Sequence, residues 1–480
     1  MTQIGNTGVK LMIGKILLVM ACGAITGKVI AQQGLPSEVE GELRQAKIPL
    51  NATAAYVQEV GSRAAWISIN AKKPFNPAST MKLVTTGAAL DLLGPTYAWT
   101  TQAYITGNLR DGVLNGDLII KGGGDPKFLG AHLWQFLRLL HAKGIRDIRG
   151  NVLLDRSAFE TSDFDPAAFD GAPEKAYNAG PDALLLNFKA VKLQFMPDST
   201  IGKARVGIDP PLGGFALDMP ALSDGDCNGW QNKLTPDVHD GGARFTGTYD
   251  AACGEKSWFL HAYRMSNDQY FGAIFRQLWR EVGGSLHGNV KSSKTPRDAI
   301  HLAEWRSPAL PEIVHDINKF SNNVMARQLL LTLAADPMGQ PATTEQGARV
   351  IKGWLANQRI EAPELVIENG SGLSRAERIS AATMGKLLAA MWRSPRMPEF
   401  MASLPIAAHE GSMRNRLKET SVAGKAYIKT GGLREVRTIA GYVQAASGRR
   451  YVVVHFINHE NAGAGRAAQD ALLQWVYDNG

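Results

Sequence analysis

Strand-rich segments at both ends of the chain enclose a helical middle, and this arrangement most limits the possible folds. Near the start, apolar runs at residues 54–60 and 64–69 are joined by Gly61 and Ser62, which predicts a β-hairpin. Near the end, residues 423–429, 438–445 and 450–457 are predicted to be three consecutive strands. We therefore expect one α/β domain that is assembled from the two ends of the chain.

A long stretch separates these ends. About 240 residues lie between Lys82, at the start of the helix predicted at residues 81–93, and a polar motif at Ser321, and a stretch of that length must fold on its own. It alternates strand signals with a helix at residues 131–143, and then becomes rich in Gly, Asp and short β-runs. We predict a main domain (32–96 and 298–480), an inserted domain (97–187 and 263–297) and a second, β-rich domain inserted within the first (188–262).

The first 31 residues differ from the rest of the chain. Lys10 and Lys15 precede an apolar run at residues 16–25, which is too short to span a bilayer but has the length of a secretory signal. Small residues precede Gln32 and suggest cleavage there. We predict a signal peptide over residues 1–31 and export to the periplasm. A buried N-terminal helix and a lipoprotein signal at Cys22 are the alternatives.

The charge balance after residue 31 argues against several classes of protein. Removing residues 1–31 leaves 49 basic and 44 acidic side chains, a net charge of +5. This surplus is small for a large protein, whereas nucleic-acid binders carry a clustered basic face. No later segment has the length and apolarity of a membrane helix, and no Cys-x-x-Cys pair or His-rich cluster suggests a metal. We expect no nucleic-acid partner, no stable membrane span and no cofactor.

Two cysteines remain after residue 31, and both lie in the β-rich inserted segment. In an oxidising compartment Cys227 and Cys253 are expected to form a disulfide that closes a loop of roughly 25 residues. Two independent buried thiols are the alternative interpretation.

Ser79 and Lys82 form an S-x-x-K pattern at the start of the helix predicted at residues 81–93. Residues three apart share a helix face, so the lysine amine is expected beside the serine hydroxyl. A serine needs a base to become a nucleophile, and a desolvated lysine close to a second cation can have its pKa lowered enough to serve. Taken alone, the pattern also fits a capped amphipathic helix.

Ser321 and Asn323 form an S-x-N pattern in a loop before an apolar helix predicted at residues 324–333. A hydroxyl in this loop can relay a proton between Lys82 and a leaving nitrogen, and the Asn323 amide can orient the substrate and Lys82. Serine and asparagine are also favoured helix N-caps, so this pattern alone is weak evidence for catalysis.

Lys429, Thr430 and Gly431 are expected at the end of an apolar strand. Lys429 raises the local positive potential, and Thr430 can hydrogen-bond a carboxylate. The N–H of Gly432, paired with that of Ser79, can form an oxyanion hole. A strand that ends in Lys and Gly is otherwise ordinary. The order, spacing and structural setting of all three motifs together predict a nucleophile, its base, a proton relay and an anion-binding strand.

These motifs, with residues 177–184 and 369–374, resemble the low-molecular-mass class C penicillin-binding proteins, a D-Ala-D-Ala carboxypeptidase/endopeptidase family. The resemblance covers most of the chain after residue 31. It implies a transpeptidase-like domain with an antiparallel sheet flanked by helices, and two nested inserted domains. It also implies an acyl-enzyme on Ser79, release of terminal D-Ala and often cleavage of cross-links. Peptidoglycan stem peptides are then the expected substrates, and β-lactams the expected inhibitors.

This chain departs from the family pattern at Gly432, and Asp170 is only a candidate match to a family residue. The family usually carries Ser or Thr after K-T-G, whereas this chain has Gly432, so a hydroxyl that helps to hold the terminal carboxylate is missing. Arg434 or Arg437 is a candidate replacement. Asp170 is a candidate for the inserted-domain acid that recognises the free amine of a diaminopimelate side chain, and a solvated loop residue is the alternative. A β-lactamase and a catalytically silent wall-binding module are the competing functions.

Overall fold

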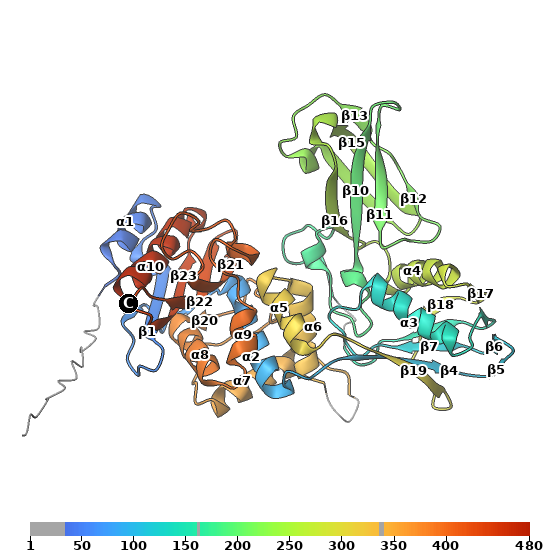
Figure 1. Ribbon diagram of the computed structural model, residues 1–480, viewed down its shortest axis with the longest axis horizontal. Helices are drawn as coiled ribbons and strands as arrows, with labels where there is room; N and C mark the ends of the chain where they lie inside the picture. The colour runs from blue at the N-terminus through green and yellow to red at the C-terminus, as the bar shows by residue number, and fades with distance from the viewer. Residues whose placement is uncertain (1–33, 161–163, 336–339) are drawn as a thin grey trace, which may run out of the picture.

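The computed structural model describes residues 34–160, 164–335 and 340–480. The predicted signal peptide, its cleavage site and Cys22 lie outside these residues. The described part of the molecule is elongated, with its first and last elements, α1 (Ser37–Gln45) and α10 (Arg466–Asn479), in one lobe and the intervening residues extending away from it (Figure 1). Within the described ranges, no helix has the length and apolar character needed to cross a membrane.

The two ends of the chain form one antiparallel sheet with strand order β2-β1-β23-β22-β21. Its strands are β1 (Thr53–Glu59), β2 (Ile67–Ile69), β21 (Ala426–Leu433), β22 (Val436–Gln444) and β23 (Arg450–Asn458). β1 pairs with β2 as the predicted hairpin, and it pairs with β23 along its whole length. The prediction of an antiparallel sheet that joins the two ends is confirmed.

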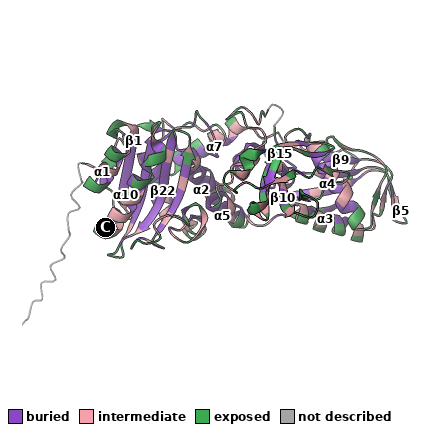
Figure 2. Cartoon of the chain, turned by 90° about the horizontal axis from the view of Figure 1, so that it is seen from above, coloured by how far each residue is buried: buried purple, intermediate pink, exposed green. Residues whose placement is uncertain are grey.

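Both faces of this sheet are covered by helices. Successive side chains of a strand point to opposite faces, and β1 shows this directly. Tyr56 packs with the large helical layer, whereas Ala55 and Val57 pack with α1 (Ser37–Gln45) and α10 (Arg466–Asn479). The central strands are therefore almost continuously apolar and buried, as the purple ribbons of Figure 2 show.

The large helical layer surrounds α2 (Lys82–Leu93), which has every residue from Lys82 to Leu90 buried. A helix that is apolar on all sides is stable only inside a core, and the other helices of this layer supply that core. They are α5 (Leu310–Lys319), α6 (Asn323–Leu333), α7 (Thr344–Asn357), α8 (Ala381–Arg393) and α9 (Met397–Ala402). Lys82 is thus the first residue of a helix that is almost completely shielded from water.

The intervening residues form separate sheets. The first has the order β18-β9-β7-β4-β19 and the second the order β17-β8-β6-β5, and both lie near α3 (Gly130–Ala142) and α4 (Asn267–Glu281) (Figure 1). Their strands are β4 (Thr100–Ile105), β5 (Asn108–Arg110), β6 (Val113–Asn115), β7 (Leu118–Lys121), β8 (Asp147–Ile148), β9 (Val152–Asp155), β17 (Ser285–Leu286), β18 (Val290–Ser292) and β19 (Ile300–Arg306).

A β-rich unit stands above α3 and α4 in Figure 1. Its seven strands have the order β12-β15-β13-β11-β10-β16, with β14 paired to β15. The strands are β10 (Ala190–Asp198), β11 (Lys203–Asp209), β12 (Ala216–Leu217), β13 (Ala221–Ser223), β14 (Leu234–His239), β15 (Gly242–Asp250) and β16 (Lys256–His261). The predicted boundaries between the domains stay a prediction.

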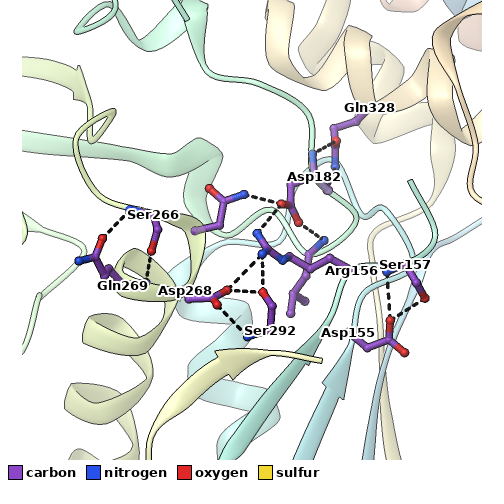
Figure 3. Close-up of polar contacts among 11 residues, drawn as sticks. Asp155, Arg156, Ser157, Asp182, Ser266, Asp268, Gln269, Ser292 and Gln328 are labelled. Carbon is purple, nitrogen blue, oxygen red and sulfur yellow. Dashed lines mark hydrogen bonds and ion pairs between the residues drawn. The ribbon is translucent and has the colours of Figure 1, made fainter. Parts of the chain in front are cut away.

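A buried polar junction ties the intervening residues to α6 (Figure 3). The Gln328 amide of α6 accepts from Asp182 N at 2.9 Å and donates to Asp182 O at 2.8 Å. Arg156 then bridges the carboxylates of Asp182 and Asp268, at 3.0 and 3.2 Å. This junction fixes the position of α6, and α6 begins at Asn323 of the S-x-N motif.

The predicted disulfide is present. Cys227 and Cys253 are bonded and close a loop with a sequence separation of 26 residues. Cys253 is buried in the same apolar cluster as the strands of the β-rich unit.

Replacing both cysteines with serine is expected to lower the free energy of unfolding of the β-rich unit by about 3 kcal/mol, because the open loop gains entropy in the unfolded chain. Denaturant unfolding of the oxidised protein and the double variant measures this difference. Reduction of the unmodified protein should give the same shift, and unchanged unfolding midpoints would contradict the expectation.

Candidate active site

Ser79 lies in a tight 3₁₀ turn, Ala78–Met81, and α2 follows it directly. The sequence predicted a regular helix near Ser79, and the difference has a local cause. Ala78 has a φ of 45°, which is outside the helical region, so the chain cannot enter an α-helix before Ser79. Lys82 still lies one turn on, with 3.1 Å between its Nζ and the Ser79 Oγ.

The Lys82 amine is fully buried and has three oxygen neighbours. Its Nζ lies 3.1 Å from the Ser79 Oγ, 2.5 Å from the Asn323 Oδ1 and 2.5 Å from the Ser371 carbonyl oxygen. A neutral amine has two protons and one lone pair. It can donate to Asn323 and Ser371 while its lone pair accepts the proton of Ser79.

Burial is the main reason why the pKa of Lys82 falls well below its ordinary value. The positive charges of Lys429 and Arg327 lower this pKa further, whereas Glu377 raises it. None of the described acidic side chains forms an ion pair with the amine. The site therefore favours the neutral amine, which is the form that acts as a base.

The loop that supplies the Ser371 carbonyl is organised by a buried carboxyl group. Glu377 is fully buried, and its Oε1 accepts from the backbone N–H groups of residues 368, 369 and 370 at 3.1, 3.0 and 2.9 Å. On the opposite side, the loop lies against the turn that carries Ser79. A Cβ at Gly372 would lie 1.8 Å from the Ala78 carbonyl oxygen. Glu377 and Gly372 thus position the loop against Ser79 and Lys82.

The second polar pair joins Ser321 to Lys429. The fully buried Lys429 amine donates to the Ser321 Oγ at 2.9 Å and to the Thr430 carbonyl at 2.8 Å. Burial lowers the pKa of Lys429 to about 7. Ser321 has a φ of 58°, an uncommon conformation that costs on the order of 1–3 kcal/mol and is concentrated at functional sites. Asn322 caps α6 by accepting from Met325 N, so the motif occupies the predicted helix-entry loop.

The K-T-G residues lie inside β21 rather than at its end, so the prediction of a strand end was wrong. β21 continues to Leu433 because β22 pairs across the glycines, Thr438 with Gly431 and Arg437 with Gly432. A Cβ at Gly431 would lie 2.1 Å from the Thr438 Oγ1, 2.8 Å from the Pro77 carbonyl oxygen and 2.9 Å from Ser79 N. Glycine at this position lets β21 approach the backbone of Ser79 and brings the two polar pairs together.

Thr430 and Gly432 face a cavity beside β21. The Thr430 hydroxyl donates to the Ser412 Oγ at 2.7 Å. Gly432 is exposed, and a Cβ built on it would lie 3.3 Å from the Arg437 Nη1. Of the two proposed replacements for the missing hydroxyl, Arg437 therefore has a guanidinium next to the position that a side chain at residue 432 would take.

Asp170 lies apart from these residues, in the loop that leads to Asn178. Its carboxylate accepts from the Tyr177 hydroxyl at 2.8 Å and from the Asn178 amide at 2.7 Å. Asn178 also lines a cavity of about 440 Å³ shared with Asn369 and Ser374 of the loop against Ser79. The role of Asp170 in binding stays a prediction.

This geometry defines a class of enzyme. A serine beside a buried lysine of lowered pKa, with a glycine-lined strand against its backbone, is the arrangement of an acyl-transferring serine hydrolase. No group of three or more His, Cys, Asp or Glu side chains within the described ranges could hold a metal ion.

Comparison with known proteins assigns the family. The model of the D-Ala-D-Ala carboxypeptidase 3 (S13) family matches residues 35–478, so the chain belongs to that family and the predicted resemblance is confirmed. It is 27% identical over 391 residues to D-alanyl-D-alanine carboxypeptidase DacB of Haemophilus influenzae, covering 80% of this chain and 81% of that one. It is 28% identical over 419 residues to a D-alanyl-D-alanine carboxypeptidase of Actinomadura sp., covering 82% and 76%.

The fold agrees with that assignment. The crystal structure of penicillin binding protein 4 from Haemophilus influenzae superposes with a TM-score of 0.77 at 23% identity, covering 92% of this chain and 99% of that one. The chain is therefore a serine hydrolase with D-Ala-D-Ala carboxypeptidase activity.

Sequence reasoning gave no role to Ser371, Gly372 and Glu377 in the organisation of the site. Residues 369–374 were noted only as part of the family resemblance. The hydrogen bond from Lys82 to the Ser371 carbonyl joins residues that are 289 positions apart, so no local sequence pattern indicates it. The signal that could have found Glu377 is a lone acid shortly after a run of glycines and serines.

Changing Gly431 to alanine is expected to lower the rate of acylation by penicillin by a factor of roughly 10²–10³, because the new methyl group pushes β21 away from Ser79 N and disturbs the oxyanion hole. Stopped-flow measurement of acylation tests this. Gly432→Ala is the matched control, since its Cβ would meet only the flexible Arg437 side chain within 3.4 Å. Equal losses in the two variants would contradict the role given to Gly431.

Proposed function

We propose that Ser79 is the nucleophile that attacks the carbonyl between the two terminal D-Ala residues of peptidoglycan stem peptides. The observation that carries this proposal is the buried Lys82 amine, which lies 3.1 Å from the Ser79 Oγ and is held by two further oxygens. Its neutral form accepts the Ser79 proton as the Oγ–carbon bond forms.

Breakdown of the tetrahedral intermediate breaks the carbon–nitrogen bond and releases D-Ala. The leaving nitrogen needs a proton at that moment, and the Ser321 hydroxyl, hydrogen-bonded to Lys429, relays one that originates on Lys82. Water then attacks the acyl-enzyme, with Lys82 again taking a proton, and Ser79 is regenerated. Asn323 orients both Lys82 and the backbone of the substrate.

Charge on the intermediate is stabilised from β21. The N–H groups of Ser79 and Gly432 act as the oxyanion hole, and each donor contributes roughly 3–4 kcal/mol to the transition state. Thr430 and Arg437 bind the terminal carboxylate, and Gly431 keeps the strand within reach.

The third residue of the stem peptide is proposed to lie in the cavity of about 440 Å³ beside Asn369 and Ser374. Phe169, Arg375 and Asp165 also line this cavity, so it offers an apolar wall with both signs of charge. Asp170 supports the cavity through Asn178, and we retain it as a substrate-binding residue for a side-chain amine.

Two further features complete the proposal. The enzyme also cleaves cross-links as a D,D-endopeptidase, since the same acyl-enzyme forms whichever amine leaves. It works in the periplasm after export, and the disulfide between Cys227 and Cys253 agrees with an oxidising compartment.

Incubation with penicillin followed by mass spectrometry tests the nucleophile. The unmodified protein is expected to carry one covalent adduct on Ser79, and Ser79→Ala none, because the Ser79 hydroxyl is the one that lies 3.1 Å from the Lys82 amine. Ser371→Ala is a matched control, since only its carbonyl contacts Lys82. An adduct retained by Ser79→Ala would refute the assignment. Rapid loss of the adduct from the unmodified protein would favour a β-lactamase.

A further inference from the structure

A cavity of about 640 Å³ opens beside β21. Thr430, Gly431 and Gly432 form its inner wall, so the cavity begins at the strand that holds the terminal carboxylate. Its outer wall contains Arg434, Arg437 and Arg466. One D-Ala leaving group is far smaller than this space.

The cavity has an unusual charge. Four arginines and no acidic residue are found among the described residues that line it. Arg416 is neutralised by Asp470, to which its Nε and Nη2 donate at 3.0 and 2.6 Å. Within the described ranges, Arg434, Arg437 and Arg466 have no carboxylate partner. Three positive charges thus face the same space without an internal counter-charge.

Two of these arginines are close enough to affect one another. Burial is the main cause of the lowered pKa of Arg437, and the charge of Arg466 lowers this pKa further. The Arg437 Nη1 donates to the Leu433 and Val436 carbonyls at 2.6 and 2.8 Å, which fixes its guanidinium at the turn between β21 and β22. A preorganised guanidinium is well suited to carboxylate binding.

An unsatisfied donor points to a ligand independently of the charge. Gln469 of α10 lines the cavity and is only 1% exposed, yet its buried Nε2 has no hydrogen-bond partner among the described residues. A buried donor without a partner costs on the order of 1–3 kcal/mol, so such groups are rare unless something binds them. A carboxylate oxygen that reaches this amide after rotation of the Gln469 side chain would satisfy it.

We infer that this cavity is a subsite for a leaving group that carries several carboxylates, namely the neighbouring stem peptide of a cross-linked substrate. The inference rests on the proposed function and specifies its substrate class. Gly432 fits this use, because a side chain there would lie against Arg437 at the entrance. Arg437 takes the carboxylate adjacent to the scissile bond, and Arg434, Arg466 and Gln469 take those farther along the leaving peptide.

The reaction at this subsite is the same acyl transfer. The Ser79 Oγ bonds to the carbonyl carbon of the D-Ala, and the bond from that carbon to the side-chain amine of the neighbouring peptide breaks. The amine leaves with the proton relayed through Ser321, and water later releases the acyl group. The arginines contribute only binding of the departing peptide.

Two substrates distinguish a loss of binding at this subsite from a loss of catalysis at Ser79. One is a monomeric pentapeptide muropeptide, which releases D-Ala with a single carboxylate. The other is a cross-linked muropeptide dimer, which releases a peptide with several. We expect Arg466→Gln and Arg434→Gln each to lower kcat/KM for the dimer on the order of tenfold, and for the pentapeptide by less than about threefold. Both side chains are exposed, so the variants should fold.

Arg393→Gln is the matched control, because it removes the same charge from an exposed position on α8 that does not line the cavity. It should leave both substrates unaffected. Equal losses on the two substrates in Arg466→Gln and Arg434→Gln, or no loss on the dimer, would overturn the inference. So would a failure of the unmodified protein to cleave the dimer. Penicillin acylation at Ser79 distinguishes these outcomes from a failure of the proposed function itself.

Discussion

The contacts of the Lys82 amine are the interaction on which the rest of the site depends. Three distant segments meet at one nitrogen: the turn that carries Ser79, the start of α6 at Asn323 and the loop at Ser371. Each contact is made by a neutral oxygen, so the amine is hydrogen-bonded without being fixed as an ammonium ion. A carboxylate at the same distance would hold the proton on the lysine and remove the base.

The fold buries the Lys82 amine and holds its three oxygen neighbours in place. α2 is buried on all sides, which desolvates Lys82, and the polar junction of Gln328, Asp182 and Arg156 holds α6 in place from the far side. Glu377 organises the Ser371 loop through three backbone N–H groups, and Gly431 brings β21 against Ser79. The residues between α2 and α5 are therefore hydrogen-bonded, through Asp182 and Gln328, to the helix that begins at Asn323.

Local patterns predicted the hairpin of β1 and β2, the three C-terminal strands, the helix-entry position of Ser321 and the pairing of Ser79 with Lys82. The local patterns gave wrong or incomplete predictions where contacts between distant segments determine the structure. The glycines after Lys429 suggested a strand end, yet β22 pairs across them through Thr438 and Arg437. The roles of Ser371, Glu377 and the arginine-lined cavity depend on residues far apart in the sequence, and no periodicity or spacing records such contacts.

Direct titration of the Lys82 amine tests the central claim most directly. NMR spectra of protein labelled with ¹³C at lysine Cε, assigned by comparison with Lys82→Arg, follow its protonation as the pH changes. Our account predicts that Lys82 loses its proton well below the ordinary lysine pKa of about 10.4, because the folded site favours the neutral amine. A Lys82 that stays protonated up to that value would contradict its role as the base.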